Sequence, residues 1–342
     1  MKVEFIDIKN RCSFNSFLEN NSFTTVEHYF LLEEIESNYS FIVYFNNKPA
    51  LFFPLVLENI NNTLKGAFKG VSLPSPLFDG VIESNKIRKR IIKYALDIID
   101  SICLDNQVES LKINFLTTLI NINEYQILHT LLKKNFYYLD IFDIGFLDLN
   151  EVDIYRKFSK GLKSDIKRWK NTLEINYFNY GVELLTFENF INELEYYKGS
   201  DLKILYTFYI ENKLDFITIK QDNKNCGYLL FLIDSNNKIV NYYSAFKLEE
   251  INIPIHAIGL YYAIEKYISK GYSQLELGIL SSSVNLGYIP SIKQQKISNF
   301  KNAFGLKLKH MSVYQKFFSM DDYFVYVDNQ LQKLINSYGI EI

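Results

Sequence analysis

The sequence has few of the residues that bind metals or form disulfides. Its 342 residues include three cysteines and four histidines. No two cysteines stand in a C-x-x-C spacing, and no two histidines stand in an H-x-x-x-H spacing. The odd, scattered cysteines exclude a disulfide framework and are typical of a reducing compartment, and the spacings exclude the usual zinc sites. We therefore predict no metal site.

Long apolar runs are also missing. No stretch approaches the roughly 20 consecutive apolar residues that a membrane-spanning helix needs. The N-terminal stretch MKVEFIDIKNRCSF lacks the continuous apolar segment of a secretory signal. We therefore expect a cytoplasmic protein without a transmembrane segment, for which peripheral contact with a membrane stays open.

Acidic residues are absent from one long part of the chain. From Leu277 to Met320 there is no Asp or Glu, although the formal net charge of the whole sequence is −2. This uneven distribution indicates a region of positive potential that binds an anionic ligand such as a nucleotide, a pyrophosphate or a nucleic acid. The stretch contains six lysines: Lys293, Lys296, Lys301, Lys307, Lys309 and Lys316.

Hydrophobic and aromatic residues, in contrast, are abundant. The sequence is 48% hydrophobic and contains 28 Phe and 26 Tyr, which excludes general disorder and supplies a large core. A chain of this length favours two domains. The predicted elements repeat: each half contains a strand hairpin or meander, a helix and a returning strand. The expected strands and helix cover 41–45, 50–58, 64–71, 85–102 and 109–116 in the first half, and 215–220, 226–234, 238–246, 256–271 and 273–278 in the second.

This order predicts an α+β protein with two domains of one topology, each a mostly antiparallel mixed sheet with flanking helices. We place the first domain at 1–150 and the second at 151–320. The last segment, 321–342, is predicted to form an amphipathic helix.

A basic segment, 151–172, opens the second half and is predicted to be one helix. Its apolar stripe consists of Tyr155, Phe158, Leu162, Ile166 and Trp169, and its adjoining basic face of Arg156, Lys160, Lys163, Lys167 and Lys170. Two interpretations stay open. The lysines either extend over the apolar edge into water, or they bind a phosphate-bearing ligand.

A second unusual segment is ISNFKNAFG at 297–305. Ile297, Phe300 and Phe304 follow a helical spacing, and Lys301 lies at the edge of the same face. Gly305 ends the pattern where a helix C-cap favours a glycine with positive φ. A lysine at this place either extends from an apolar boundary or presents its charge to a ligand.

Together these segments resemble the FemAB-type transferases, which are double-GNAT proteins, and the related BioF2-like N-acyltransferases. The resemblance covers Tyr155–Asn171, Lys238–Gly278 and the motif F-K-x-x-F-G at Phe300–Gly305. It implies two tandem GNAT-like domains, with the motif in the second and the C-terminal helix packed back on the first. It also implies transfer of an acyl or aminoacyl group to a primary amine of a cell-envelope precursor, either an amino sugar of a surface polysaccharide or a peptidoglycan peptide.

The donor implied by this family is an acyl-CoA or an aminoacyl-tRNA, with no tightly bound cofactor. The sequence departs from the family in two ways. It has no long helical hairpin of the kind that recruits tRNA. The segment LEEINIPIHAIG also lacks the glycine-rich phosphate loop of enzymes that use acetyl-CoA. The second departure counts against acetyl-CoA but leaves a larger acyl donor open.

The resemblance assigns the central role to Lys301, which we expect to contact the donor carbonyl or the phosphate-bearing end of the donor. Aminolysis of an ester or thioester forms a tetrahedral oxyanion, and a cation in a low-dielectric site stabilises it. Phe300 and Phe304 are expected to hold the helix end that presents this lysine. For the catalytic base we consider Glu276, although the substrate or a water molecule can also accept the proton. Tyr242, Tyr243 and Ser244 on the preceding strand could hydrogen-bond the substrate, and Tyr243 is counted among the catalytic candidates. The expected substrate contacts include Ser244, and Lys160 on the basic face for a phosphate-bearing ligand. Arg156, Lys65 and Lys69 are expected to contact an acceptor that carries a nucleotide or lipid pyrophosphate.

A function of another class is also compatible with these residues. The basic segment and the C-terminal lysines could serve a non-catalytic protein that binds RNA or a nucleotide. Such a protein would bind generic RNA with a steep dependence on salt and would consume no amine.

Overall fold

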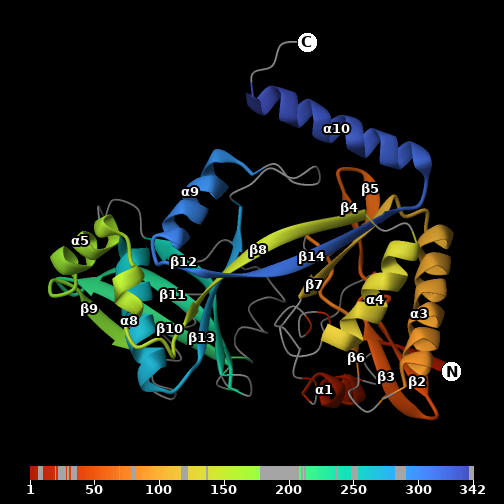
Figure 1. Cartoon of the computed structure of the whole chain (residues 1–342), viewed down its shortest axis with the longest axis horizontal. Coiled ribbons are helices and arrows are strands. Elements are labelled where there is room, and N and C mark those ends of the chain that lie inside the picture. The colour runs from red at the N-terminus through yellow and green to blue at the C-terminus, as the bar shows by residue number, and fades with distance from the viewer. Residues whose placement is uncertain are drawn as a thin grey trace. The chain divides into compact units, whose positions relative to one another are not determined.

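The computed structural model divides the chain into two compact units (Figure 1). Unit 1 comprises Met1–Phe142, Ser283–Ser291 and His310–Ile342, and unit 2 comprises Asp143–Ser282 and Ile292–Lys309. The structure describes residues 1–6, 11–19, 21, 28, 31, 37–68, 70–78, 82, 84–116, 122–135, 138–177, 208, 211, 213–235, 238–247, 253–281 and 290–338.

Unit 1 contains a small antiparallel sheet in the order β1-β2-β3-β6. Its strands are β1 (Lys2–Phe5), β2 (Phe41–Phe45), β3 (Lys48–Phe53) and β6 (Leu77–Phe78), and α1 covers Arg11–Glu19. The β2–β3 turn is made by Asn46 and Asn47, whose φ angles are 50° and 61°. Asparagine tolerates this left-handed conformation, which suits a tight hairpin.

A second group of strands in unit 1 runs in the order β4-β5-β7-β14. These strands are β4 (Leu57–Ile60), β5 (Thr63–Gly66), β7 (Ser110–Leu116) and β14 (Lys307–Phe317). The parallel pair β5–β7 requires a crossover, and the long helix α3 (Asn85–Asp105) lies between them in the chain. The remaining helices of unit 1 are α4 (Ile122–Lys134) and α10 (Met320–Tyr338).

Unit 2 has a sheet in the order β8-β13-β12-β11-β10-β9. β12 and β13 are parallel, while the other neighbouring pairs are antiparallel. Helix α8 (Ile255–Ser269) connects the two parallel strands and packs on β10, β11 and β12, and α5 (Lys160–Trp169) packs on α8 (Figure 1). The strands are β8 (Tyr138–Asp148), β9 (Glu174–Tyr177), β10 (Leu214–Gln221), β11 (Lys224–Asp234), β12 (Ile239–Lys247) and β13 (Gln274–Leu280); α9 covers Ile292–Asn302.

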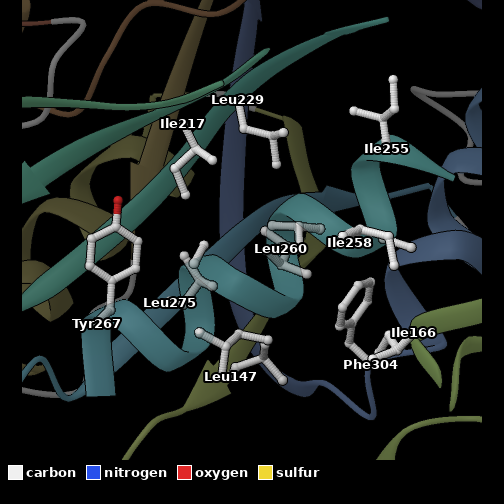
Figure 2. Packing of buried hydrophobic residues seen from close by; sticks show 14 of the residues in the cluster. Leu147, Ile166, Ile217, Leu229, Ile255, Ile258, Leu260, Tyr267, Leu275 and Phe304 are labelled. Carbon is white, nitrogen blue, oxygen red and sulfur yellow. The ribbon is translucent and has the colours of Figure 1, made fainter. Parts of the chain in front are cut away.

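The core of unit 2 forms around α8, as Figure 2 shows. Ile258, Leu260 and Ile264 of this helix are fully buried, which explains why it is apolar on most of its faces. Gly259 permits the close approach of helix and sheet, because a Cβ atom there would lie 2.3 Å from Leu229 Cδ1. Leu229 belongs to β11, so this contact fixes the distance between α8 and the strand below it.

The predicted α+β class is therefore confirmed, but the helix predicted over 151–172 is wrong. The structure has a short 3-10 helix, η1 (Ile154–Lys157), and then the separate helix α5. Phe158 between them is extended, and the Ser159 side chain caps α5 by accepting a hydrogen bond from the Leu162 amide at 3.2 Å. A serine cap starts a new helix where the apolar spacing alone suggested continuation.

Candidate functional site

The candidate site of unit 2 is built on α9, which packs against β13. Ser298 on this helix is 1% exposed and fixes the contact. Its Oγ accepts a hydrogen bond from the Ser281 amide at 2.7 Å and donates one to the Gln294 carbonyl at 3.0 Å. One face of α9 is thereby held at the end of β13, and another face is turned towards a pocket.

This pocket has a volume of about 720 Å³. Six of its described lining residues come from α9, and the other two come from β12 and α8. On the helix they form two parallel rows. Within each row the residues are four positions apart, which is the spacing along one helical face. The first row is Ile292, Lys296 and Phe300, the second is Lys293, Ile297 and Lys301, and Tyr242 and His256 complete the lining.

Lys301 is partly buried at this pocket. Its Nζ donates a hydrogen bond to the Ile279 carbonyl at 3.1 Å. Burial disfavours the charged form and lowers the pKa of Lys301 from 10.5 to about 8. The amine is thus mostly protonated at neutral pH, but its charge is poorly solvated.

Gly278 of β13 lies beside Lys301 and has a backbone conformation that favours glycine. Its φ is +78°, and a Cβ atom built on it would lie 3.6 Å from Lys301 Nζ. The register of β13 against β8 shifts between Glu276 and Gly278, which marks a bulge at this point. A glycine accommodates both the bulge and the positive φ without strain.

The two phenylalanines of the F-K-x-x-F-G motif have different environments. Phe300 lines the pocket and contacts the His256 ring edge-on, with ring centroids 6.2 Å apart. Phe304 is fully buried and lies among the core residues beside Ile166 (Figure 2). Phe300 and Phe304 also contact each other edge-on at 5.6 Å, so the core residue supports the pocket residue.

The strands β12 and β13 pair over a short length. Among the residues that the structure describes, their parallel pairing joins Ile239–Asn241 to Gln274–Glu276 and goes no further. β12 then carries an irregularity, because Tyr242 and Ser244 pair with consecutive residues of β11 and Tyr243 is the extra residue. Tyr242, directly after the paired segment, lines the pocket, and burial raises the pKa of its hydroxyl. Tyr243 and Ser244 belong to β12, but their side chains lie outside the described part of the structure.

Glu276 does not line the pocket among the residues described. Its carboxylate forms an ion pair with Lys309, and the side chains of both are mostly buried. Lys309 also lies over the Phe146 ring, with its Nζ 5.9 Å from the ring centroid. The carboxylate that we considered as a base is thus engaged in an ion pair with Lys309.

The predicted acceptor contacts are spread over the chain. Arg156 belongs to η1, is mostly exposed and pairs with Asp153. Lys160 is exposed at the start of α5. In unit 1, Lys65 on β5 pairs with Glu109 at 2.9 Å. Lys69 lies outside the described residues.

The lysines of the acid-free stretch divide into two groups. Lys307, Lys309 and Lys316 pair with carboxylates from other parts of the chain, namely Asp148, Glu276 and Asp100. Lys293, Lys296 and Lys301 face the pocket instead. The region of positive potential that the sequence predicts is therefore smaller than the acid-free stretch, and its lysines lie on α9.

From the sequence, Lys293 and Lys296 were named only as part of the acid-free stretch and Ile297 only as part of a helical face, and Ile292 and His256 were not named at all. The four on α9 had a detectable signal, because both rows repeat every four residues around Lys301. His256 had none, since its place depends on how α8 packs. Among the residues that the structure describes, no group of three or more His, Cys, Asp or Glu side chains could hold a metal ion. In the same part of the chain, no helix combines the length and apolar character that crossing a membrane requires.

Sequence comparison gives no relative for this chain. No protein-family model matches it, and no curated protein does.

Comparison of structures does find similar folds. The chain is similar to the structure of L-PGS from Bacillus licheniformis, with 12% identity, a TM-score of 0.58, and coverage of 96% of this chain and 98% of that one. It is similar to FemX, with 10% identity, a TM-score of 0.56, and coverage of 91% and 97%. A tandem GNAT protein from the clavulanic acid biosynthesis pathway is 9% identical, with a TM-score of 0.53 and coverage of 92% and 98%.

These identities are low, so the likeness concerns the fold. It extends over nearly the whole length of each chain. The expected tandem GNAT-like architecture and the resemblance to FemAB-type proteins are confirmed at this level.

Proposed function

We propose, from this tandem GNAT-like fold and the lysine-lined pocket of unit 2, that the protein transfers an acyl or aminoacyl group to a primary amine. The observation that carries the proposal is the position of Lys301. It holds a poorly solvated ammonium group at a pocket that also contains Tyr242, the residue directly after the paired part of β12 and β13. Function is inferred here from these groups and from the fold together, because a fold alone hosts many activities.

The reaction would be the aminolysis of an activated ester or thioester. The neutral amine attacks the carbonyl carbon, a C–N bond forms, and the bond to the carrier oxygen or sulfur breaks. Negative charge develops on the carbonyl oxygen during the attack. In our proposal the ammonium of Lys301 stabilises this oxyanion, and its partial burial strengthens the interaction relative to water.

Lys293 and Lys296 are proposed to bind an anionic part of the donor. Both are exposed at the pocket, and neither forms an ion pair with a residue that the structure describes. They can therefore reach a phosphate group without giving up an existing partner. Phe300 would pack against the donor from the neighbouring row of α9, and Phe304 would support Phe300 from the core.

The proton of the attacking amine has several candidate acceptors. Glu276 stays a prediction as the base, Tyr243 stays a prediction as a catalytic residue, and Ser244 stays a prediction as a substrate contact. Because Glu276 is paired with Lys309, we favour transfer of the proton to a water molecule or to the leaving group. The acceptor class rests on the resemblance to FemAB-type transferases, which suggests an amine of a cell-envelope precursor. Arg156, Lys160, Lys65 and Lys69 remain proposals for its contacts.

The test is mass spectrometry of the products formed by the full chain from activated acyl or aminoacyl donors and amine acceptors. We expect an amide product. Lys301→Met should lower its rate of formation about 10²–10³-fold, the usual effect of removing one oxyanion donor. Lys301→Arg, which keeps a cation, should retain more activity than Lys301→Met.

The matched control is Lys270→Met, which changes an exposed lysine that follows α8 and does not line the pocket. A folded Lys301→Met protein with full activity would contradict the site assignment. If no donor and acceptor pair gives an amide, and the protein instead binds generic RNA with a steep salt dependence, the non-catalytic alternative holds.

A further inference from the structure

Exposed apolar side chains on α9 indicate what kind of group enters the pocket. Ile292 is 73% exposed and Ile297 is 42% exposed, although both line the pocket. Such side chains contribute little to the stability of the fold, because most of their surface stays in water. With Phe300 and Tyr242 they form an apolar surface that a ligand could cover.

The charges of the pocket restrict the ligand further. The described lining contains three lysines, Lys293, Lys296 and Lys301, and no Asp or Glu. An acyl group with its own ammonium would meet three like charges and no carboxylate, which is unfavourable where water is partly excluded. An uncharged acyl chain avoids this repulsion, and an anionic carrier gains from the two exposed lysines.

We propose that the donor is an acyl thioester with an apolar chain of medium or long length on a phosphate-bearing carrier such as coenzyme A. The chain covers Ile292, Ile297 and Phe300, Lys301 faces the thioester carbonyl, and Lys293 and Lys296 contact the phosphates. This inference rests on the proposed transferase function. In the reaction the thioester C–S bond breaks and the amide C–N bond forms. The amine proton leaves with the sulfur as a free thiol.

An apolar chain would also compensate for a weak phosphate site. The segment LEEINIPIHAIG, which leads into the first residues of α8, has no glycine-rich phosphate loop. The carrier alone should therefore bind weakly, and burial of the chain should supply much of the affinity. Burial of one methylene strengthens binding by about fourfold until the apolar surface is covered.

The experiment measures binding by isothermal titration calorimetry with the full chain and no acceptor. The probes are coenzyme A, acetyl-CoA, octanoyl-CoA and 8-aminooctanoyl-CoA, which places an ammonium at the chain end. We expect octanoyl-CoA to bind at least 100-fold more tightly than acetyl-CoA. 8-Aminooctanoyl-CoA should bind at least tenfold more weakly than octanoyl-CoA.

Two pairs of variants separate the apolar contribution from the ionic one. The double variant Ile292→Ser/Ile297→Ser should lower the ratio of the octanoyl-CoA affinity to the acetyl-CoA affinity at least tenfold. It should leave the affinity for coenzyme A unchanged. Its control, Ile268→Ser, changes an exposed isoleucine of α8 that does not line the pocket. Lys293→Gln/Lys296→Gln should weaken all four probes by a similar factor, and Lys270→Gln should weaken none.

Equal binding of acetyl-CoA and octanoyl-CoA would overturn the inference, and so would tighter binding of the 8-amino compound. Either result would leave the proposed transferase function standing with a different donor. Failure of that function would appear separately, as chain-length-dependent binding without any amide product.

Discussion

Burial makes the charge of Lys301 costly to the folded protein. Its pKa is lowered from 10.5 to about 8 because the ammonium group loses hydration. Below pH 8 the lysine is protonated in both the folded and the unfolded state, and the folded state carries the full desolvation cost. Between pH 8 and 10.5 the unfolded chain binds more protons, so the free energy of unfolding rises with pH, by at most about 1.4 kcal/mol per pH unit. A lysine that destabilises the fold at neutral pH is typical of a functional position.

Replacing Lys301 should remove this dependence. We expect Lys301→Met to be more stable than the wild type at pH 7, because the variant has no charge to desolvate. The difference in the free energy of unfolding should shrink as the pH rises above 8. Urea denaturation at several pH values between 7 and 10 measures it, with Lys270→Met as the control. A difference that stays constant over this range would show that Lys301 has an ordinary pKa.

The end of α9 depends on one glycine. The helix ends at Asn302, and Phe304 and Gly305 donate backbone hydrogen bonds to the Lys301 and Asn302 carbonyls at 3.1 and 3.0 Å. Gly305 then adopts a φ of +70°, as the sequence predicts for a C-terminal cap. A Cβ atom there would lie 2.5 Å from Lys157 Cβ and 2.8 Å from the Lys157 carbonyl oxygen. The glycine thus ends the helix and lets the chain pass close to η1.

Gly305→Ala should therefore destabilise unit 2 strongly. The left-handed backbone alone costs an alanine about 1–2 kcal/mol, and the contact with the Lys157 backbone requires a further shift. We expect a total loss of about 2–4 kcal/mol in the free energy of unfolding, measured by urea denaturation. Gly161→Ala is the matched control, because this position lies in α5 with nothing within 4 Å of the added Cβ. It should stabilise the protein by about 0.5–1 kcal/mol. Equal effects of the two changes would contradict our account of Gly305.

The elements show where sequence reasoning succeeds and where it fails. The helix that carries Lys301 and the cap at Gly305 depend on neighbours within a few positions, so local spacing predicts them. The helix over 151–172 fails because the apolar spacing continues past Ser159, which starts α5 as its cap. Hydrogen bonding of one side chain ends the regularity that periodicity alone suggests.

The ion pairs of the lysines in the acid-free stretch could not be predicted from the sequence, for a different reason. Lys307 and Lys316 pair with Asp148 and Asp100, which lie 159 and 216 positions away in the chain. The acid-free stretch thus overstated the positive region, since carboxylates on β8, β13 and α3 pair with half of its lysines. The pocket was likewise unpredictable in detail. Tyr242 was one of three candidates on its strand for a substrate contact, and His256 reaches the pocket only through the packing of α8.

The two units differ in how the chain builds them. Unit 2 is almost continuous, because 143–282 and 292–309 lie within one segment. Unit 1 combines the N-terminal part with 283–291 and 310–342. Met311–Phe317 of β14 pair with β7, and Tyr314 is fully buried against Phe115, with ring centroids 6.0 Å apart. The domain boundaries at 150 and 320 stay predictions, and this division suggests a direct way to study the folding of each unit.

A fragment of residues 143–309 should fold without the rest of the chain, because it contains every residue of unit 2. A fragment of residues 1–142 should not, because it lacks the strand that pairs with β7 and the buried Tyr314. Loss of a buried aromatic residue alone costs about 3–5 kcal/mol, which is a large part of the stability of a domain. Circular dichroism and urea denaturation of the two fragments measure this. We expect a cooperative transition for 143–309 and none for 1–142. Addition of residues 310–342 to the second fragment through a flexible linker should restore a transition, and failure to do so would contradict the assignment of β14 to unit 1.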